Sequence, residues 1–354
     1  MNTPVSRPGM RVRLGGFFHR SGLLHLLHHA RGWVRRDFRV LAYHRVLDVA
    51  EPDRFDFDLD LVSASTQGFR QQMELLKRRF HPMPLTMMVA AVEAGERLPA
   101  HAVAVTFDDG YDDNCRFAFP ILREIGIPAT FFVSTGHIDS GLPYTYDWLV
   151  HMILCTQAEA LTIPELGLAQ PLPACHMARR RLAQRVLDRL KSLDVVAQEA
   201  TVARLETAWG LSRTAGHPDC RPMSWTQLRE MHAAGFEIGS HGVHHRMLAK
   251  LPRSELEAEL RESRRTLERE LGTPAPLISY PVGGSGAFDK QVVHATREAG
   301  YSAACSYICG INPPYVDRYA LYRLPVERDM GIDWFAAMLT LPELVGYPST
   351  NREA

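Results

Sequence analysis

The stretch Ala102–Tyr111 reads AVAVTFDDGY, and it decides how the rest of the chain is interpreted. Its apolar first part, Ala102–Phe107, predicts a buried strand. Two acids, Asp108 and Asp109, follow directly where that strand ends. In a parallel α/β barrel the carboxyl ends of the strands form the catalytic face. Asp-Asp-Gly is also common in ordinary turns, so this stretch alone leaves both a turn and a pair of functional carboxylates open.

Further apolar runs alternate with helical patterns on both sides of this stretch. Strands are predicted at Arg39–Tyr43, Ala129–Val133, Phe236–Gly239, Pro276–Tyr280, Tyr301–Cys305 and Ala320–Pro325. Helical spacing predicts helices at Thr66–Phe80 (with Thr66 as the N-cap), Asn114–Ile125, Trp225–Ala234, Arg253–Leu271 and Phe288–Ala299. Alternating strands and helices indicate a parallel sheet with helices outside it. About seven strands favour a closed α/β barrel over an open sheet.

One segment interrupts this alternation. Residues 144–222 show no good strand and one long helical stretch, from His176 to about Trp209. We expect a helical insertion between two barrel strands, which either elaborates the packing or forms a lid over a substrate groove. The predicted domains are a basic N-terminal extension (1–36), a barrel (37–345) with the insertion at about 144–222, and a C-terminal tail (346–354).

Charge is unevenly spread along the chain. The protein has 40 Lys and Arg against 40 Asp and Glu, but residues 1–36 contain seven Arg and neither Lys nor acid, so the remainder carries a formal −7. A solvated basic helix, an amphipathic helix on anionic lipid and a transit peptide all fit this arm. No stretch resembles a signal-peptide core or a transmembrane helix, and the six Cys lack CxxC spacing. We expect a cytoplasmic protein with peripheral membrane contact through the arm and no nucleic-acid partner.

A second group of chemically active residues follows the predicted strand Phe236–Gly239. Ser240–His245 reads SHGVHH, so His241 and His245 are four residues apart and can reach one metal ion from a single turn. His244 is expected to point elsewhere. Two His and one carboxylate with open positions are typical of hydrolytic zinc sites and of non-haem iron sites. A surface His cluster is the alternative.

A third motif, Ser279–Gly284, reads SYPVGG and also follows a predicted strand. Its glycines allow the backbone to approach a ligand closely, and its N–H groups are suited to face a developing oxyanion. By itself the motif is equally typical of a plain turn.

Together the three motifs resemble the polysaccharide deacetylases with the NodB homology domain, carbohydrate esterase family four. The resemblance runs from about Arg39 to Pro325, with Tyr144–Pro222 outside it, and is most specific in TFDDGYDDN (106–114), MSW (223–225) and AGFEIGSH (234–241). It implies a deformed (β/α)7 TIM-like barrel and hydrolysis of N-acetyl or O-acetyl groups on glycans. It also implies one divalent metal ion, which we expect to be Zn, although two His and one Asp also suit Fe, Co and Ni.

The resemblance assigns a role to each motif. Asp108 is implied as the general base, and Asp109, His241 and His245 as the metal ligands. The loop that would supply the oxyanion N–H and part of the sugar subsite consists of Tyr280, Pro281, Val282 and Gly283.

The sequence departs from the family pattern in four places. Gly242 stands where Ser or Thr usually follows the first His, and the lost hydroxyl is expected to weaken metal binding. Arg246 stands where Pro often follows the second His, and the third motif lacks its usual Arg or aromatic pair. No late Leu-x-x-His supplies the general acid; the last strand instead reads LYRLP (321–325).

His44 is our candidate for the missing acid. Tyr43-His44-Arg45 ends the first predicted strand, so His44 should reach the same mouth of the barrel. The exopolysaccharide deacetylases similar to the poly-N-acetylglucosamine enzyme also carry Tyr-His there. We predict that His44 protonates the leaving amine or alcohol; a strand-end His with a structural hydrogen bond is the alternative.

The predicted function is that of a metal-dependent deacetylase of a glycan or exopolysaccharide precursor, with N-acetyl groups preferred over O-acetyl groups. Two alternatives stay open. One is a hydrolase of the same fold that acts on a non-sugar amide or cyclic imide. The other is a non-catalytic glycan-binding or assembly protein that retains the barrel.

Overall fold

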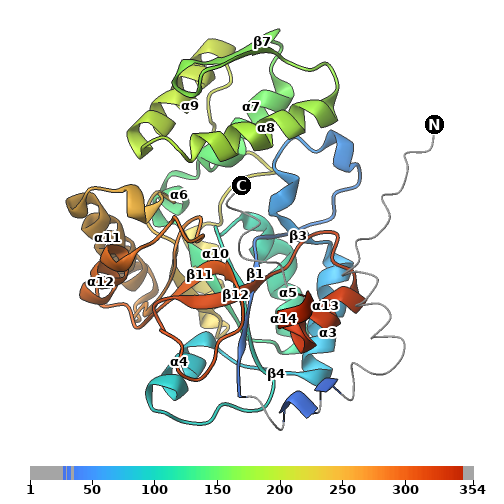
Figure 1. Ribbon diagram of the computed structural model, residues 1–354, viewed down its shortest axis with the longest axis vertical. Coiled ribbons are helices and arrows are strands. Elements are labelled where there is room, and N and C mark those ends of the chain that lie inside the picture. Colours follow the sequence, from blue (N-terminus) through green and yellow to red (C-terminus); the bar gives the residue numbers. More distant parts are fainter. Residues whose placement is uncertain (1–26, 29, 33–35, 346–354) are drawn as a thin grey trace.

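The computed structural model describes residues 27–28, 30–32 and 36–345, and its centre is a closed barrel of seven parallel strands (Figure 1). Around the barrel the order is β1 (Arg39–Tyr43), β12 (Leu321–Pro325), β11 (Ala303–Cys309), β10 (Leu277–Ser279), β9 (Glu237–Ser240), β6 (Ala129–Val133) and β5 (Ala102–Phe107). β5 pairs back with β1, and Tyr43 lies opposite Phe107. The predicted deformed (β/α)7 barrel and all seven of its strands are confirmed.

Alternation along the strands decides which side chains face the inside of the barrel. In β5, Val103, Val105 and Phe107 pack toward the outer helices, whereas the small side chains of Ala102 and Ala104 belong to the interior cluster. Because successive strand residues point to opposite faces, this pattern directs the residue after the strand, Asp108, inward. In the same way β1 directs His44 inward.

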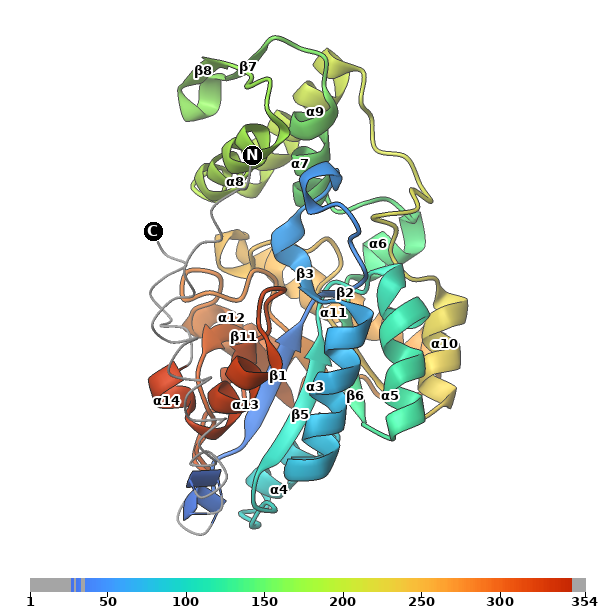
Figure 2. The same cartoon turned by 90° about the vertical axis from the view of Figure 1, so that its right-hand side faces the viewer.

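Helices cover the outside of the barrel (Figure 2). They are α3 (Thr66–Arg79), α5 (Phe119–Ile125), α6 (Thr135–Ser140), α10 (Trp225–Ala233), α11 (Arg253–Leu271), α12 (Lys290–Glu298), α13 (Ile332–Thr340) and α14 (Pro342–Val345). A further helix, α4 (Leu85–Glu93), covers the amino end of the barrel (Figure 2), where its buried side chains pack against the interior cluster. Three short strands complete the barrel domain: β2 (Arg45–Val46), β3 (Val62–Ala64) and β4 (His81–Pro82). The predicted helices are present with small shifts at their ends.

Two helix starts differ from the prediction. The N-cap of α3 is Ser65 rather than Thr66, because the Ser65 side chain accepts a hydrogen bond from the Gly68 N–H. The predicted helix Asn114–Ile125 consists of a π-helical turn, Asn114–Ala118, followed by α5.

The insertion lies between β6 and β9 in the chain and above the barrel in Figures 1 and 2. It contains α7 (Thr145–Cys155), β7 (Ala160–Ile163), β8 (Leu168–Pro171), α8 (His176–Leu190) and α9 (Val195–Trp209). The expectation that it lacks a strand was wrong, since β7 and β8 form an antiparallel hairpin. The single long helix was also wrong: Asp194 accepts from the Ala197 N–H and starts a second helix.

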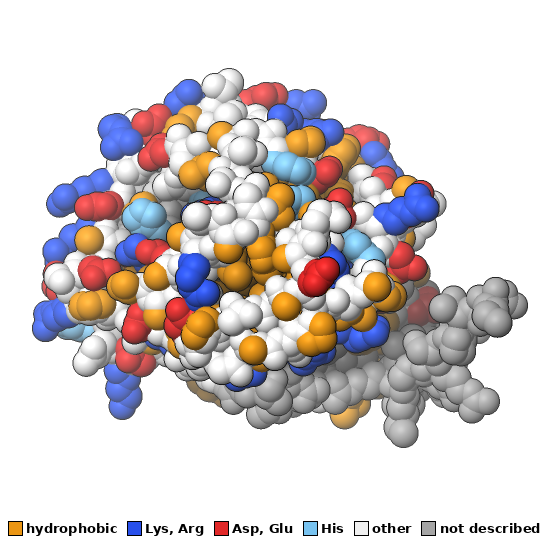
Figure 3. All heavy atoms as spheres, turned by 90° about the horizontal axis from the view of Figure 1, so that it is seen from above, with side chains coloured by type: hydrophobic (Ala, Val, Ile, Leu, Met, Phe, Trp, Pro, Cys, Tyr) orange, Lys and Arg blue, Asp and Glu red, His pale blue; other side chains and the backbone are white. Residues whose placement is uncertain are grey.

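The face that carries the insertion has a mixed charge. Figure 3 shows acidic and basic side chains interspersed around its rim, with hydrophobic side chains near the middle. The predicted tail (346–354) and most of the predicted extension (1–36) lie outside the described residues. Within the described part of that extension, His28 Nε2 is hydrogen-bonded to the Arg79 carbonyl and Arg31 pairs with Asp37 and Glu343. Among the described residues, no helix is both long and apolar enough to cross a membrane.

Candidate active site

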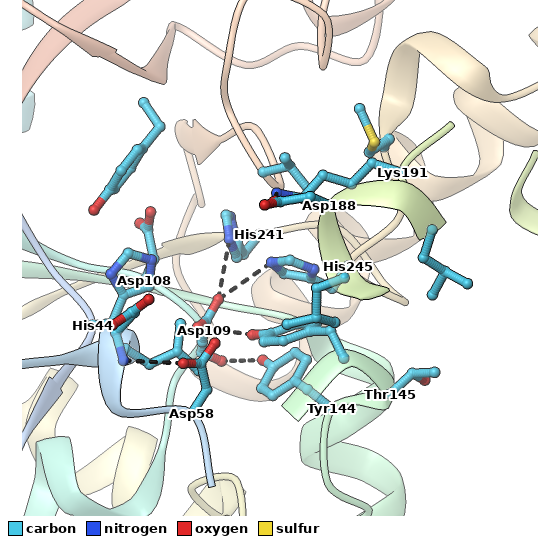
Figure 4. Close-up of a pocket in the computed structure, with 18 of the residues that line it drawn as sticks. His44, Asp58, Asp108, Asp109, Tyr144, Thr145, Asp188, Lys191, His241 and His245 are labelled. Carbon is cyan, nitrogen blue, oxygen red and sulfur yellow. Dashed lines mark hydrogen bonds and ion pairs between the residues drawn. The ribbon is translucent and has the colours of Figure 1, made fainter. Parts of the chain in front are cut away.

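Seven of the nine predicted site residues come together at the carboxyl end of the barrel. They follow β1, β5, β9 and β10 and line a single cavity of about 670 Å3: His44, Asp108, Asp109, His241, His245, Tyr280 and Val282. Figure 4 shows Asp109 with His44 on one side and His245 on the other. Parallel strands place their carboxyl ends at one mouth, which is why residues far apart in the chain meet there.

Asp109, His241 and His245 form the one candidate metal group among the described residues. Asp109 Oδ1 lies 3.4 Å from His241 Nε2 and 3.3 Å from His245 Nε2. This oxygen is buried and has no hydrogen-bond partner among the described residues. Since a buried carboxylate oxygen is normally satisfied, an unpaired one facing two imidazole nitrogens fits a divalent cation. His244 turns away, as expected, to Glu259.

The neighbours of the three residues fix their orientation. His241 Nδ1 donates to the Ser279 carbonyl at 2.7 Å, which leaves the Nε2 lone pair free for a ligand. Tyr146 donates to Asp109 Oδ2 at 2.9 Å, and Tyr144 donates to the Asp109 carbonyl. Both tyrosines lie at the start of the predicted insertion (144–222). They are outside the three motifs, so no role was predicted for them.

The backbone at Asp109 is turned to present its carboxylate. Asp109 has a φ of 72° and Gly110 a φ of 81°, both in the left-handed region. A Cβ on Gly110 would lie 2.7 Å from Val133 Cγ1, so this position requires glycine. His245 is also left-handed, with a φ of 57°. Such conformations in non-glycine residues are typical of functional sites.

Asp108 is held by an arginine that the sequence analysis missed. Arg323 of β12, fully buried, donates from Nη1 to Asp108 Oδ1 at 2.8 Å and from Nη2 to Oδ2 at 2.6 Å. Its Nη2 also donates to Ser279 Oγ, and its Nε to the Ser306 carbonyl. The sequence signal was an arginine inside the apolar strand LYRLP. This guanidinium comes from β12, whereas the family pattern has an Arg in the third motif.

Electrostatics keep both aspartates ionised. Burial raises the pKa of Asp108, but the positive charge of Arg323 and the proximity of His241 outweigh it, so the pKa lies below its usual value. Burial also raises the pKa of Asp109, but its contacts with His241 and His245 lower it well below the usual range. Asp108 is therefore an ionised carboxylate paired with a guanidinium, and Asp109 is an ionised carboxylate with one oxygen that accepts no hydrogen bond among the described residues.

His44 is anchored through its backbone. Its N–H donates to Ser63 Oγ at 2.9 Å, and its carbonyl accepts from Asn114 Nδ2 at 2.7 Å. Its ring lies 5.3 Å from that of Tyr307, centre to centre. Asn114 belongs to the TFDDGYDDN motif, so this motif fixes His44 as well as the two aspartates.

The loop after β10 is shaped by its neighbours. The Tyr280 N–H donates to the Cys305 carbonyl and its hydroxyl to the Tyr319 carbonyl. Pro281 has no N–H, and the Gly283 carbonyl accepts from the Tyr307 N–H. Val282 is left-handed, with a φ of 65°, a conformation that a β-branched residue rarely adopts. In the described part of the chain, the N–H groups of Val282 and Gly283 donate to no other group.

The insertion closes the cavity from above. Gln184 and Asp188 of α8, Lys191 directly after it, and Gln198 and Glu199 of α9 line the same cavity as the barrel residues. The insertion therefore forms part of the wall of this cavity, which fits the interpretation of the insertion as a lid.

Comparison with known proteins identifies the family. The family model described as polysaccharide deacetylase matches residues 95–163 and 174–304, more than half of the chain. The chain therefore belongs to the polysaccharide deacetylase family, as the three motifs predict.

The individual proteins that resemble this chain share only a modest part of its sequence. The poly-β-1,6-N-acetyl-D-glucosamine N-deacetylase of Escherichia coli K12 is 32% identical over 109 residues, which cover 30% of this chain and only 15% of that protein. Deacetylase PplD of Streptococcus pyogenes, solved with acetate, superposes with a TM-score of 0.56 at 17% identity, covering 83% of this chain and 94% of its own. IcaB of Ammonifex degensii gives 0.54 at 19% identity, covering 86% and 97%. These two structures share the fold.

Proposed function

We propose that this protein is a metal-dependent deacetylase that hydrolyses acetyl groups of a glycan or exopolysaccharide precursor, N-acetyl in preference to O-acetyl. One observation carries the proposal: the paired carboxylate of Asp108 lines the same cavity as the triad of Asp109, His241 and His245, in which Asp109 Oδ1 accepts no hydrogen bond among the described residues. A base that takes a proton from water and an electrophile that polarises the carbonyl both speed the hydrolysis of an amide. The name of the E. coli relative supports an N-linked acetyl group.

Asp109, His241 and His245 are the residues that would hold the metal ion. Their two imidazoles and one carboxylate suit Zn, and also Fe, Co or Ni. A divalent ion supplies Lewis acidity, which polarises an acetyl carbonyl and lowers the pKa of water toward about 7.

The other residues divide the proton transfers between them. Asp108, ionised and aimed by Arg323, accepts the proton of the attacking water. His44 donates a proton to the leaving amine. The N–H groups of the Val282–Gly283 turn would stabilise the negative charge on the acetyl oxygen. The glycan lies in the cavity below α8 and α9.

Acetate release from a panel of N-acetylated and O-acetylated glycans, with ring opening of one cyclic imide measured beside it, tests the proposal. We expect release from an N-acetylated glycan, loss of release with a chelator and recovery when zinc is added. Release that persists in the metal-free protein would contradict the metal dependence. Zinc binding without turnover of any substrate would favour the glycan-binding alternative.

A further inference from the structure

We infer that Glu259 of α11 is a positioning residue for the loop Ser240–His245, taking the part of the hydroxyl that the family has where Gly242 stands. The inference rests on the proposed metal site and extends it to a residue outside the three motifs. It concerns how tightly the loop holds a metal ion.

The Glu259 carboxylate accepts hydrogen bonds from the middle of this loop. Oε2 accepts from the Val243 N–H at 2.7 Å and from the His244 N–H at 3.1 Å. Oε1 accepts from His244 Nδ1 at 2.6 Å. One carboxylate thus satisfies three donors of two consecutive residues, and both lie between the predicted ligands His241 and His245.

The opposite side of the loop is bound by the beginning of α6. Ser134 Oγ donates to the His241 carbonyl at 2.9 Å, and the N–H groups of Thr135 and Gly136 donate to the carbonyls of residues 242 and 243. The loop is therefore held by its carbonyls on one side and by its N–H groups on the other. Glu259 supplies the second side, and without it two backbone N–H groups lose their acceptor.

The Glu259 carboxylate occupies space that a side chain at position 242 would need. Gly242 has a φ of 78°, and a Cβ there would lie 3.2 Å from Glu259 Oε2. A Ser or Thr side chain at position 242 would press on the Glu259 carboxylate, so the absence of a side chain there leaves room for this carboxylate beside the loop. The missing hydroxyl is therefore compensated by a carboxylate that is 17 positions further along the chain.

Glu259 is buried, so its charge needs partners that stabilise it. Only 4% of the residue is exposed, and its neighbours on the buried face of α11 include Leu256 and Leu260. A carboxylate in such a place is costly unless it is paired and hydrogen-bonded. The partners that stabilise it all come from the loop or its end: Val243, His244 and, at 3.9 Å, Arg246. The same Arg246 pairs with Glu199 of α9, so the loop also contacts the insertion.

Zinc affinity, measured by competition with a chromophoric chelator, tests the inference without any substrate. We expect Glu259→Ala to bind zinc about 10- to 100-fold more weakly than the wild type, the range found when partners of metal ligands are removed. Glu259→Gln should lose less than Glu259→Ala but still more than twofold, because its amide oxygen accepts from one N–H while its NH2 group cannot accept from His244 Nδ1. Glu257→Gln is the matched control: it lies on the same helix, pairs among the described residues with Arg253 and Arg261, and should stay within twofold.

Hydrogen exchange of the metal-free proteins gives a second readout, in which the amides of Val243 and His244 should exchange faster in Glu259→Ala. A folded Glu259→Ala variant with zinc affinity within twofold of the wild type would overturn the inference. If that variant does not fold, Glu259→Gln decides by the same criterion. Absence of zinc binding by the wild type would instead overturn the proposed metal site itself.

Discussion

Asp108 and Asp109 are neighbours in the chain, yet their carboxylates face different partners. Asp108 is bound on both oxygens by Arg323, whereas Asp109 Oδ1 faces two imidazoles and no hydrogen-bond donor. The left-handed backbone at Asp109 separates the two directions. At the scale of the residue, this separation is what the proposed mechanism requires of one acid as a base and of the other as a metal ligand.

Substitution of each aspartate should separate the two roles. Asp108→Asn keeps the ligand set, so we expect normal zinc content and a loss of at least about 100-fold in turnover, as is typical for removal of a general base. Asp109→Ala should lose zinc. Metal analysis beside acetate release checks both. Near-normal turnover of Asp108→Asn, or full zinc loading of Asp109→Ala, would contradict the assigned role.

Arg323 should matter for stability as well as for activity. Arg323→Met leaves Asp108 as a buried charge without its partner, and we expect a loss of about 3–5 kcal/mol in the free energy of unfolding. Urea denaturation measures it. Arg318→Met is the control, because Arg318 pairs with Glu93 near the surface and should contribute less than about 1 kcal/mol. Equal losses in the two variants would show that burial of the pair is not the cause.

At the scale of the element, the insertion shows why caps decide helix boundaries. Helical spacing continues from His176 to Trp209, yet Asp194 is extended and accepts from the Ala197 N–H at 2.8 Å, so the helix stops and restarts. The hairpin β7–β8 was missed because its strands are only four residues long. Its buried Leu161 and Ile163 do alternate with exposed residues, which was the available signal.

Removal of the Asp194 cap should weaken α9. We expect Asp194→Ala to lower the free energy of unfolding by about 1 kcal/mol, since an N-cap side chain that binds a free helix N–H contributes this much. Asp188→Ala, on the exposed side of α8, should stay within about 0.5 kcal/mol. Chemical denaturation of both variants checks the difference, and an unchanged Asp194→Ala would mean that the cap does not hold the helix.

At the scale of the whole molecule, Asp58 joins the barrel to the insertion. Asp58 Oδ1 accepts from Gln184 of α8, and the Asp58 N–H donates to Asp147 of α7. Burial, with Asp60 and Asp147 nearby, raises the pKa of Asp58 to about 7. Between about pH 4 and 7 the folded protein therefore keeps this carboxyl protonated, while the unfolded chain ionises it. The contribution of Asp58 to stability falls as the pH rises through this window and is constant above it.

Asp58→Asn should remove this pH dependence. We expect its free energy of unfolding to equal that of the wild type near pH 4 and to exceed it by up to about 4 kcal/mol at pH 8. Urea denaturation at several pH values measures the difference. Asp53→Asn, which removes an exposed carboxyl in the same segment, is the matched control for the loss of one charge. A constant difference for Asp58→Asn would contradict the raised pKa.

The basic extension leads to a proposal about location. We propose that the protein is cytoplasmic and contacts anionic membrane through residues 1–36, which would bring the barrel close to membrane-linked glycan precursors. Vesicles of phosphatidylserine and phosphatidylcholine should bind the wild type more tightly than vesicles of phosphatidylcholine alone. Replacement of Arg7, Arg11, Arg13 and Arg20 by Gln keeps the contacts of His28 and Arg31 and should weaken binding at least about tenfold. Unchanged binding after this replacement, or after deletion of residues 1–36, would contradict the proposal.

The sequence by itself determined the seven strands, most of the helices and the three motifs, because apolar periodicity and capping residues are local properties of the chain. It also placed His44, Asp108, Asp109, His241 and His245 at strand ends, from which a parallel barrel brings them to one mouth. Only the tertiary structure decided which groups support them. Arg323 is 215 positions from Asp108, Tyr146 is 37 from Asp109, and Glu259 is 15 from His244. Partners so far apart leave no periodic signal in the sequence. A buried hydrogen bond constrains the two residues that it joins and does not constrain the segment of chain between them.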